Sequence, residues 1–274
     1  MKIGFLGMGN MAQAIAEGWV AKGLVSPTDL YAYAPNQEKL AANAARIGFI
    51  PMASAKAVVQ AADTVVIGCK PYQIKSVLQE IGDEILGKSV WSIAAGWTLQ
   101  TFTDAWSEIG VNTDPDSGYC VRGVLCIMPN TPAMVGEGVF LFEKSCSLPE
   151  AELMEAKRLF EGLGVVETLP TELMGIGGYL SGCGPAFVDL FMEAYADAGV
   201  KYGLPRATAY KLIAQTVLGS AKLQMVTGKH PGELKDAVCS PNGTTICGVA
   251  ALEKAGFRSA CIECIDAIVN KKKG

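Results

Sequence analysis

Short hydrophobic segments alternate with amphipathic segments along the first half of the chain. The hydrophobic segments have the length of buried strands, and the segments between them repeat hydrophobic positions with the period of a helix. Predicted strands cover residues 3–6, 30–34, 64–69, 89–94, 124–128 and 138–142, and predicted helices cover residues 11–22, 37–46 and 74–85. This order predicts a mostly parallel, doubly wound α/β sheet.

The pattern changes after about Thr168, where strand-like segments end and long helical periods begin. Predicted helices begin near Gly184 and at Pro205, and three shorter ones follow them. The shorter helices cover residues 232–238, 245–254 and 258–270. The segment 210–226 carries more hydrophobic surface than a small all-helical domain can cover alone, which favours a helix-mediated homodimer. Packing of these helices onto the first half of the chain is the alternative.

The motif Gly7-Met8-Gly9-Asn10-Met11-Ala12 lies between the first predicted strand and the first predicted helix. This G-x-G-x-x-A pattern, in that context, is the dinucleotide-binding fingerprint of Rossmann domains. Gly7 permits the tight turn, Gly9 lets the backbone approach a pyrophosphate, and Ala12 keeps the helix close to the strand. A purely structural turn is the alternative.

A second candidate site lies near the other end of the chain, at Ser240-Pro241-Asn242-Gly243-Thr244-Thr245. The hydrophobic run that follows is predicted to be a helix. The start of a helix offers unpaired backbone N–H groups and a partial positive charge, which suit a small carboxylate. Hydroxyl groups of Ser240, Thr244 and Thr245 lie on the same short loop. Ordinary capping of the helix by these hydroxyls is the alternative.

Length suggests one or two domains, and composition favours a globular protein. The chain has 274 residues, of which 50% are hydrophobic and 18% are charged, and its formal net charge is −4. That charge provides no basic field for nucleic acid, and no hydrophobic run has the length of a membrane-spanning helix. We predict an N-terminal Rossmann-like dinucleotide-binding domain over residues 1–167 and an all-α dimerisation and substrate domain over residues 168–274.

The cysteines and the single histidine bear on compartment and metal binding. The nine cysteines are odd in number, and most lie in hydrophobic segments, Cys69 and Cys126 among them, which favours reduced thiols in the cytosol. The C-x-x-C pair at 261–264 has no second ligand pair nearby and His230 is the only histidine, so no metal site is predicted. Because the chain begins with a predicted core strand, we expect no signal peptide and a cytoplasmic protein. The lysines at 271–273 are predicted to be a solvated tail.

The end of the second predicted strand bears on the choice of cofactor. NAD-preferring sites usually place an acid there to bind the ribose hydroxyls. Residues 31–36 contain no acid, and the next one is Glu38. The absence permits a 2′-phosphate, to which Asn36 could donate a hydrogen bond and whose charge Lys39 could neutralise. NADPH is therefore favoured, with NADH as the alternative, and a merely solvated Lys39 as the structural alternative.

Further motifs, taken together and in order, extend over nearly the whole chain. They are Gly7-Met8-Gly9-Asn10-Met11, Cys69-Lys70-Pro71, Ala94-Ala95-Gly96, Met128-Pro129-Asn130-Thr131-Pro132-Ala133, Ser181-Gly182-Cys183-Gly184-Pro185-Ala186-Phe187, and His230-Pro231-Gly232-Glu233-Leu234 leading to Ser240–Thr245. This ordered set resembles the pyrroline-5-carboxylate reductase family, which carries out the last step of proline biosynthesis. The resemblance implies a Rossmann domain, a helical dimerisation domain, and reduction of the cyclic imine 1-pyrroline-5-carboxylate to L-proline. It also implies a substrate cleft shared with the partner subunit, and homodimers that in many family members assemble further.

The resemblance also implies roles for individual residues. Ser240 and the backbone N–H groups of Gly243 and Thr244 would hold the substrate carboxylate, and Thr245 would hydrogen-bond the ring nitrogen, so that Ser240 and Thr245 are the candidate catalytic residues. Asn130 and Thr131 would help to line the substrate cleft, and Lys70 and Pro71 would lie beside the nicotinamide. The full set of candidate cofactor-binding residues is Leu6, Gly7, Met8, Gly9, Asn10, Met11, Ala34, Pro35, Asn36, Lys39, Cys69, Lys70, Pro71 and Ala95.

Four positions depart from the family pattern. Asn242 replaces the glycine that usually follows Ser-Pro, and Cys183 replaces a common serine. Cys126 replaces an arginine often found two residues before the methionine of M-P-N-T-P, and Ala55 replaces an asparagine often found near the adenosine ribose. The departures concern the grip on the cofactor rather than the class of reaction.

Two other functions stay open on the sequence. A related two-domain dehydrogenase could act on a 3-hydroxy acid or on another imine. Hydroxy-acid enzymes of that kind usually carry a catalytic lysine on a long helix, whereas the helix beginning near Gly184 offers Asp189 and Glu193 but no lysine before Lys201. A dimer that senses NADPH without catalysis is the second alternative, and the Ser240–Thr245 loop argues against it because a sensor needs no second anion site.

Overall fold

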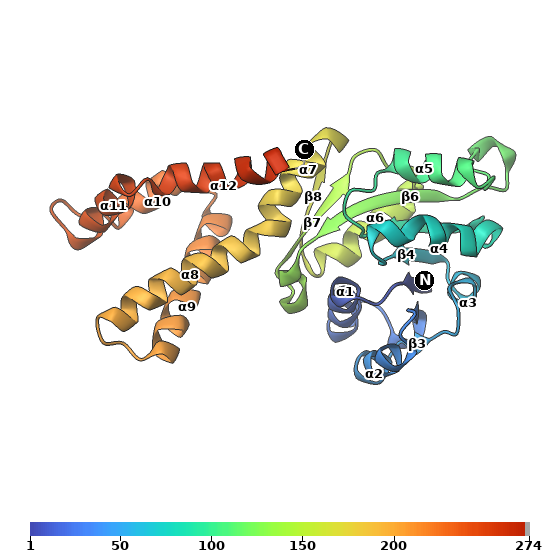
Figure 1. The fold of residues 1–274 in the computed structure, drawn as a ribbon, viewed down its shortest axis with the longest axis horizontal. Coiled ribbons are helices and arrows are strands. Elements are labelled where there is room, and N and C mark those ends of the chain that lie inside the picture. Colours follow the sequence, from blue (N-terminus) through green and yellow to red (C-terminus); the bar gives the residue numbers. More distant parts are fainter. Residues whose placement is uncertain (272–274) are drawn as a thin grey trace. The chain divides into compact units, whose positions relative to one another are not determined.

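The computed structural model describes residues 1–271 of the protein. The chain divides into two compact units, Met1–Gly182 and Cys183–Gly274 (Figure 1). The predicted domain boundary after residue 167 stays a prediction. The division into compact units falls after Gly182, and compact units do not by themselves define functional domains. Lys272 and Lys273 of the predicted lysine tail lie outside the described residues.

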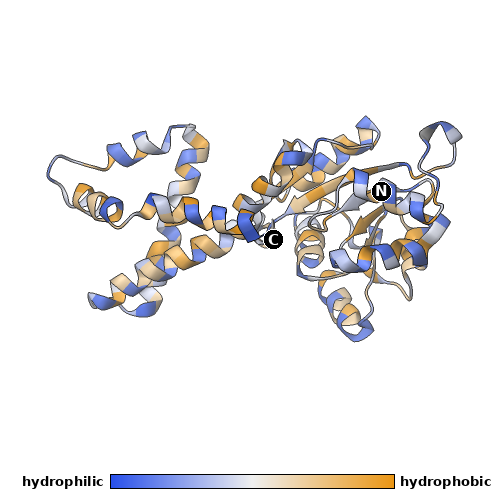
Figure 2. Ribbon diagram, turned by 45° about the horizontal axis from the view of Figure 1, so that its top comes forward, coloured by the Kyte–Doolittle hydropathy of each residue, from blue (hydrophilic) through white to orange (hydrophobic). Residues whose placement is uncertain are grey.

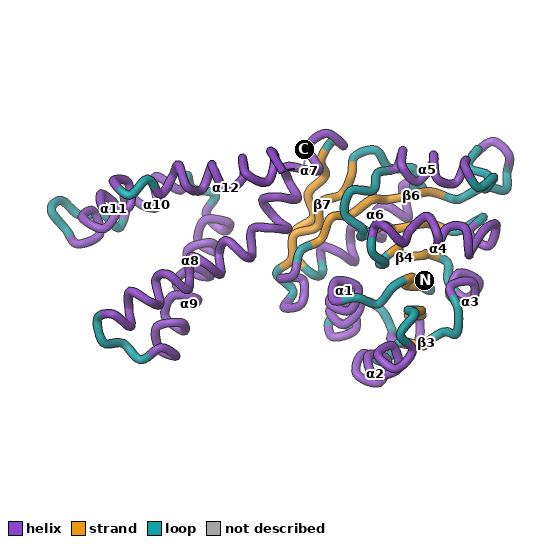
Figure 3. The backbone as a smooth tube through the Cα atoms, viewed as in Figure 1, coloured by secondary structure: helices purple, strands orange, loops and turns teal. Residues whose placement is uncertain are grey.

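The first unit is built on one eight-stranded sheet in the order β3-β2-β1-β4-β5-β6-β7-β8. Figure 3 shows strands of this sheet in orange. Neighbouring strands are parallel, except that β6 and β7 are antiparallel. The strands are β1 (Ile3–Leu6), β2 (Leu30–Tyr33), β3 (Ile50–Pro51), β4 (Thr64–Ile67), β5 (Ser89–Ser92), β6 (Gly123–Pro129), β7 (Gly138–Glu143) and β8 (Gly164–Leu169). Because β1 lies between β2 and β4, the chain reverses its winding direction at β1, which is where doubly wound sheets bind their ligands.

Helices cover both faces of this sheet. They are α1 (Asn10–Ala21), α2 (Gln37–Ile47), α3 (Ala55–Ala61), α4 (Ile74–Ile81), α5 (Leu99–Glu108), α6 (Glu150–Glu161) and α7 (Thr171–Gly178). Successive strand residues point to opposite faces, so Phe5 joins a core with α1, α2 and α6, whereas Leu6 joins a core with α3, α4 and α5. Burial on both faces explains why the strands read as continuous hydrophobic runs rather than alternating ones.

Local signals set several helix ends in this unit. The side chains of Ser54 and Thr98 accept hydrogen bonds from the third backbone N–H of α3 and α5, respectively. Gly48, with a left-handed φ of 96°, ends α2. The predicted helix over 74–85 ends early, at Ile81, because Gly82 has a φ of 52° and a tighter helical turn (Gly82–Ile85) follows.

The second unit is entirely helical within the described residues. Its helices are α8 (Gly184–Lys201), α9 (Arg206–Thr227), α10 (Pro231–Ala237), α11 (Thr244–Lys254) and α12 (Phe257–Lys271), and a π-helical turn, Tyr179–Cys183, precedes α8. Of its described hydrophobic residues, Ala196 and Ala209 are buried. Figure 2 shows how much hydrophobic sequence these helices carry. The predicted fold class, a doubly wound sheet followed by an all-α domain, is confirmed.

The structure also contains elements that the sequence pattern did not predict. They are β3, α3, α5, α6, β8 and α7. Of these, β3 has 2 residues and α3 has 7, which is too short for a periodic pattern to form.

None of the helices within residues 1–271 is long and hydrophobic enough to cross a membrane.

Candidate functional site

A cavity of about 800 Å³ lies at the carboxyl ends of β1, β2, β4 and β5. Its wall includes the residues that directly follow each of these strands, namely Gly7, Ala34, Gly68 and the segment 93–95. This edge of the sheet, at the strand where the winding direction reverses, is where open α/β sheets bind ligands. The position of the cavity therefore follows from the topology of the sheet.

The backbone conformation at Gly7 and the neighbouring chain after β4 require a glycine at this position. Its φ is +100°, and a Cβ atom there would lie 2.6 Å from the backbone nitrogen of Cys69. The backbone N–H of Gly7 donates to the carbonyl oxygen of Tyr33 at 2.8 Å. The turn after β1 thus packs directly on the backbone that follows β4 and is hydrogen-bonded to the end of β2.

Gly9 has no such requirement. It is the N-cap of α1 with an ordinary φ of −77°, and a Cβ atom there would meet nothing within 4 Å. The first turn of α1 contains no acidic residue and no side chain caps it, so its backbone N–H groups remain available to an anion. A glycine that the protein does not need, in front of an uncapped helix on a cavity wall, fits the approach of a pyrophosphate group.

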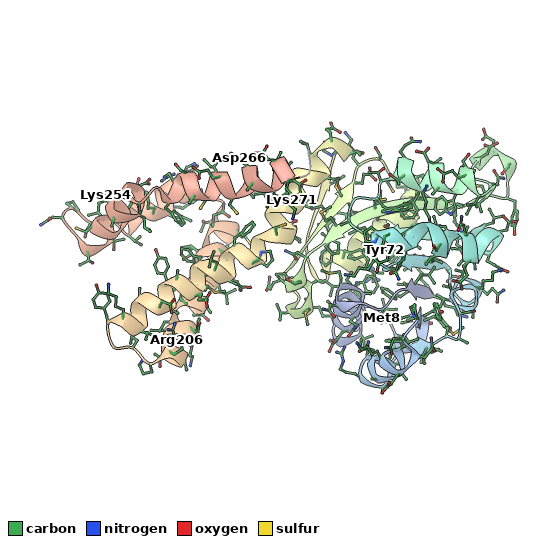
Figure 4. The ribbon with its side chains drawn as sticks, viewed as in Figure 1. Met8, Tyr72, Arg206, Lys254, Asp266 and Lys271 are labelled. Atoms are coloured by element: carbon green, nitrogen blue, oxygen red, sulfur yellow. The ribbon has the colours of Figure 1, made fainter. Side chains whose placement is uncertain are left out.

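All of the predicted cofactor-binding residues line this cavity, and so does Thr131 of the predicted substrate residues. The lining residues that had been predicted are Leu6, Gly7, Met8, Gly9, Asn10, Met11, Ala34, Pro35, Asn36, Lys39, Cys69, Lys70, Pro71, Ala95 and Thr131. Figure 4 marks Met8 on the turn before α1, and Tyr72, which follows the Lys70-Pro71 pair. The assignment of these residues to a bound dinucleotide remains a prediction.

The charged residues of the cavity wall are Lys39, Lys70 and Glu80. Lys39 lies in the first turn of α2 and is exposed. Next to it, the side-chain oxygen of Asn36 accepts the backbone N–H of Lys39 at 2.9 Å and caps α2. That bond directs the carbonyl end of the Asn36 amide toward the helix and leaves its NH₂ group as a donor. Glu38 does not belong to the wall, so the end of β2 presents a cation and an amide rather than an acid.

Cys69 forms part of the wall directly after β4. Burial raises the pKa of its thiol to about 11, against a weaker opposing effect of a backbone hydrogen bond. At neutral pH the thiol therefore stays protonated and uncharged. It presents a small, neutral surface to the cavity.

Asn130 is a predicted site residue whose side-chain amide is hydrogen-bonded at both ends. It is 6% exposed and does not belong to the cavity wall. Its Nδ2 donates to the carbonyl oxygen of Ser181 at 3.0 Å, and its Oδ1 accepts the backbone N–H of Val139 at 2.8 Å. Asn130 thus ties the loop after β6 to β7 and to the π-helical turn Tyr179–Cys183.

The predicted substrate residues Ser240, Gly243, Thr244 and Thr245 lie together at the start of α11. Gly243 is the N-cap, and its N–H donates to the Ser240 carbonyl at 3.0 Å. A Cβ atom at Gly243 would collide with the Ser240 hydroxyl, so that hydroxyl lies beside the N-cap residue of the helix. Asn242 has a φ of 57°. Asparagine tolerates this left-handed conformation better than other residues with a Cβ, which explains how it replaces a glycine here.

The cavity wall also includes residues outside the predicted cofactor-binding set. Ala12, Ala55 and Ala94 had been named in the sequence without being assigned to the cofactor. The residues that the sequence argument did not single out are Ala14, Tyr33, Leu40, Asn43, Gly68, Gln73, Val77, Glu80, Ile93 and Met134. Helical spacing could have identified some of them, because Asn43 follows Lys39 by one turn of α2, and Val77 follows Gln73 by one turn at α4. Ala55 belongs to the wall, so the position that carries an asparagine in the resembling family does face the cavity in this chain.

The winding of the sheet, the glycine turn at an uncapped helix and the cavity beside it define a nucleotide-binding protein of the Rossmann class. Residues 2–96 match the family model for NADP oxidoreductase, coenzyme F420-dependent, and residues 171–274 match the model for pyrroline-5-carboxylate reductase dimerisation. The chain is 40% identical to the pyrroline-5-carboxylate reductase of Escherichia coli over 99% of its own length and 97% of that protein. It belongs to the pyrroline-5-carboxylate reductase family.

Solved structures agree with this assignment. The pyrroline carboxylate reductase of Plasmodium falciparum, with NADP bound, is 29% identical with a TM-score of 0.84 and covers 100% of this chain and 97% of its own. The pyrroline-5-carboxylate reductase of Coxiella burnetii is also 29% identical, has a TM-score of 0.86, and covers 99% of this chain and 97% of its own.

Proposed function

We propose that the protein reduces 1-pyrroline-5-carboxylate to L-proline with NADPH. The observation that carries this proposal is the cavity at the carboxyl edge of the sheet, whose wall contains every predicted cofactor residue and ends on an uncapped helix with Gly9 in front of it. The family membership of the chain over almost its full length supports the same reaction. The NADP found in the Plasmodium falciparum relative supports the choice of nucleotide.

The protein contributes position and electrostatics to this reaction. A bound nicotinamide supplies the hydride. A cyclic imine with a protonated nitrogen is already electrophilic at carbon, so the reaction needs no strong acid from the chain. The residues have to hold the substrate, orient its imine carbon and exclude water.

The substrate carboxylate is proposed to bind at the start of α11. The first N–H groups of a helix have no acceptor within the helix, and the aligned peptide dipoles favour a negative charge there. Thr244 and Thr245 are the first two residues of α11, and the Ser240 hydroxyl lies beside the N-cap residue Gly243. Thr245 is proposed to hydrogen-bond the ring nitrogen as it changes from iminium to amine.

The proposal is tested by following NADPH oxidation with pyrroline-5-carboxylate, and then with NADH in its place. Turnover with pyrroline-5-carboxylate, and none when 3-hydroxyisobutyrate is offered with NADP⁺, is the expected result. The second substrate tests the hydroxy-acid alternative. This chain lacks the mid-helix lysine that such enzymes usually carry, because Lys201 is the last residue of α8. Tight NADPH binding without turnover of any imino acid would instead favour a nucleotide sensor.

Lys39→Ala is expected to raise the KM for NADPH about tenfold and to change the KM for NADH less than about twofold, because only NADPH carries a 2′-phosphate for this cation to neutralise. Steady-state kinetics with both nucleotides measure the effect. Lys157→Ala is the matched control, since Lys157 is an exposed lysine on α6 whose partner is Glu161 at 3.8 Å. Equal changes for the two nucleotides would contradict the role of Lys39.

We also propose that the protein acts as a homodimer through its helical unit and can assemble further. Residues 171–274 match a dimerisation model, and several large hydrophobic side chains of this unit are solvent-exposed in the single chain. Leu190 is 65% exposed, Met225 is 63% exposed and Val226 is 76% exposed. Exposed hydrophobic side chains in such numbers are typical of an interface between subunits.

All nine cysteines are free thiols, which supports a reducing compartment, and we place the enzyme in the cytoplasm.

A further inference from the structure

Glu143, the last residue of β7, is a deeply buried acid outside the cavity wall. It is 2% exposed. A carboxylate in this position is costly unless hydrogen-bond donors or cations surround it. The groups around Glu143 therefore indicate what its burial achieves.

Three donors from different parts of the first unit converge on this carboxylate. Its Oε2 accepts the backbone N–H of Leu99 at 2.9 Å, and its Oε1 accepts the hydroxyl of Thr171 at 2.8 Å. The thiol of Cys126, on the neighbouring strand β6, is a third donor; burial first, and then the charge of Glu143, raise the pKa of that thiol, so it stays protonated. Leu99 and Thr171 are the first residues of α5 and α7, so one side chain holds the starts of two helices.

The segment that leads into α5 is part of the cavity wall. Ile93, Ala94 and Ala95 line the cavity, and the chain then reaches α5 through the N-cap residue Thr98. At its beginning the segment is fixed to the sheet, because Ile93 N–H donates to the carbonyl of Ile67 at 3.0 Å. At its end, the bond from Leu99 to Glu143 fixes it again. Glu143 thus holds one of the two ends of this stretch of wall.

We propose that Glu143 is a positioning residue that sets the conformation of the segment 93–98, whose residues 93–95 line the cavity, and thereby the affinity for the dinucleotide. The inference rests on the proposed function insofar as the ligand is NADP(H). The negative charge suits the place, because the start of α5 favours an anion, and the hydroxyl and thiol donors complete the shell. Glutamine at this position can keep the arrangement: its amide oxygen can accept from Leu99, while its NH₂ donates to the Thr171 hydroxyl.

Glu143→Ala is expected to raise the Kd for NADP⁺ about fivefold to twentyfold, because it leaves the Leu99 N–H without its buried acceptor and the Thr171 hydroxyl with only the exposed Ser145 hydroxyl, at 3.1 Å. Glu143→Gln is expected to stay within about twofold of wild type. Titration calorimetry with NADP⁺ measures both. Hydrogen exchange read by mass spectrometry should be faster for peptides covering 93–99 in Glu143→Ala only. Glu155→Ala is the matched control, because it removes a glutamate whose ion pair with Arg158 lies at the surface, within α6.

The kinetics separate positioning from simple loss of folded enzyme. A purely structural defect lowers the active fraction, and hence kcat, at unchanged KM. We expect the KM for NADPH to rise with the Kd, and kcat to fall less than about twofold. If Glu143→Ala fails to fold, Thr171→Val removes one donor at nearly constant volume and should still raise the Kd about twofold to fivefold.

Wild-type NADP⁺ affinity in a folded Glu143→Ala protein, or in Thr171→Val where the alanine variant does not fold, would overturn the inference. So would a glutamine variant as impaired as the alanine variant. The calorimetry and the exchange need no imino acid. A wild-type protein that binds NADP⁺ but does not reduce pyrroline-5-carboxylate would therefore refute the proposed function and leave the role of Glu143 to be decided by the binding data.

Discussion

Gly9→Val is expected to weaken NADP⁺ binding at least about a hundredfold while lowering the free energy of unfolding by no more than about 1 kcal/mol. The protein itself tolerates a side chain here, since φ is −77° and a Cβ atom meets nothing within 4 Å. The expected stability loss is that of a poor N-cap residue. A pyrophosphate at the start of α1, by contrast, would meet the new methyl groups and lose several charge-assisted bonds to backbone N–H groups. Calorimetric titration and urea denaturation measure the two effects.

Gly7→Ala provides the opposite case on the same turn. Its new Cβ would lie 2.6 Å from the backbone nitrogen of Cys69, at a φ of +100°. A destabilisation of about 2–5 kcal/mol is expected from the backbone conformation and the collision together. If Gly9→Val bound NADP⁺ as well as wild type, the cavity would not hold a pyrophosphate at this turn, and the cofactor assignment would fail.

The sequence predicts the parts of the site that local patterns encode. The turn from Gly7 to Ala12 is one, because a strand, two glycines and a helix have to follow one another without interruption. The end of β2 is another, because the missing acid can be read directly from residues 33–36. The start of α9 was predicted to within one residue because Pro205 directly precedes it, and the helix predicted over 232–238 begins one residue after the observed start at Pro231. In each case the sequence signal lies within a few consecutive residues.

Contacts between distant residues could not be predicted in this way. Glu143 meets Leu99 across 44 residues, and Asn130 meets Ser181 across 51. In the sequence, Glu143 is one acid at the end of a hydrophobic strand, and nothing nearby signals its burial. From its motif, Asn130 was predicted to help line the substrate cleft, which stays a prediction; the structure adds that both ends of its amide bind backbone groups. Such roles depend on the three-dimensional arrangement of the sheet, which spacing alone does not supply.

Threonine hydroxyls on the helices of the second unit differ in what they contact. Thr216 and Thr227, inside and at the end of α9, donate to the carbonyl oxygens of Leu212 and Leu223 at 2.8 and 2.7 Å. Thr245 is the second residue of α11 and has no carbonyl four residues earlier within the helix to receive its hydroxyl. It is exposed. Position on the helix therefore leaves its hydroxyl available to a ligand.

Thr245→Val is accordingly expected to lower kcat/KM for pyrroline-5-carboxylate by roughly tenfold to several hundredfold, equivalent to about 1.4–3.5 kcal/mol of lost transition-state stabilisation. Valine keeps the shape of threonine and removes the hydroxyl that would follow the ring nitrogen through the reaction. Thr245→Ser should recover most of the rate, because it restores the hydroxyl. Thr216→Val, which removes a hydroxyl bonded only within its own helix, is the control and should leave the kinetics unchanged. Steady-state rates that do not differ between Thr245→Val and wild type would exclude Thr245 from the mechanism. The rest of the proposal would stand, because no other part of it depends on that hydroxyl.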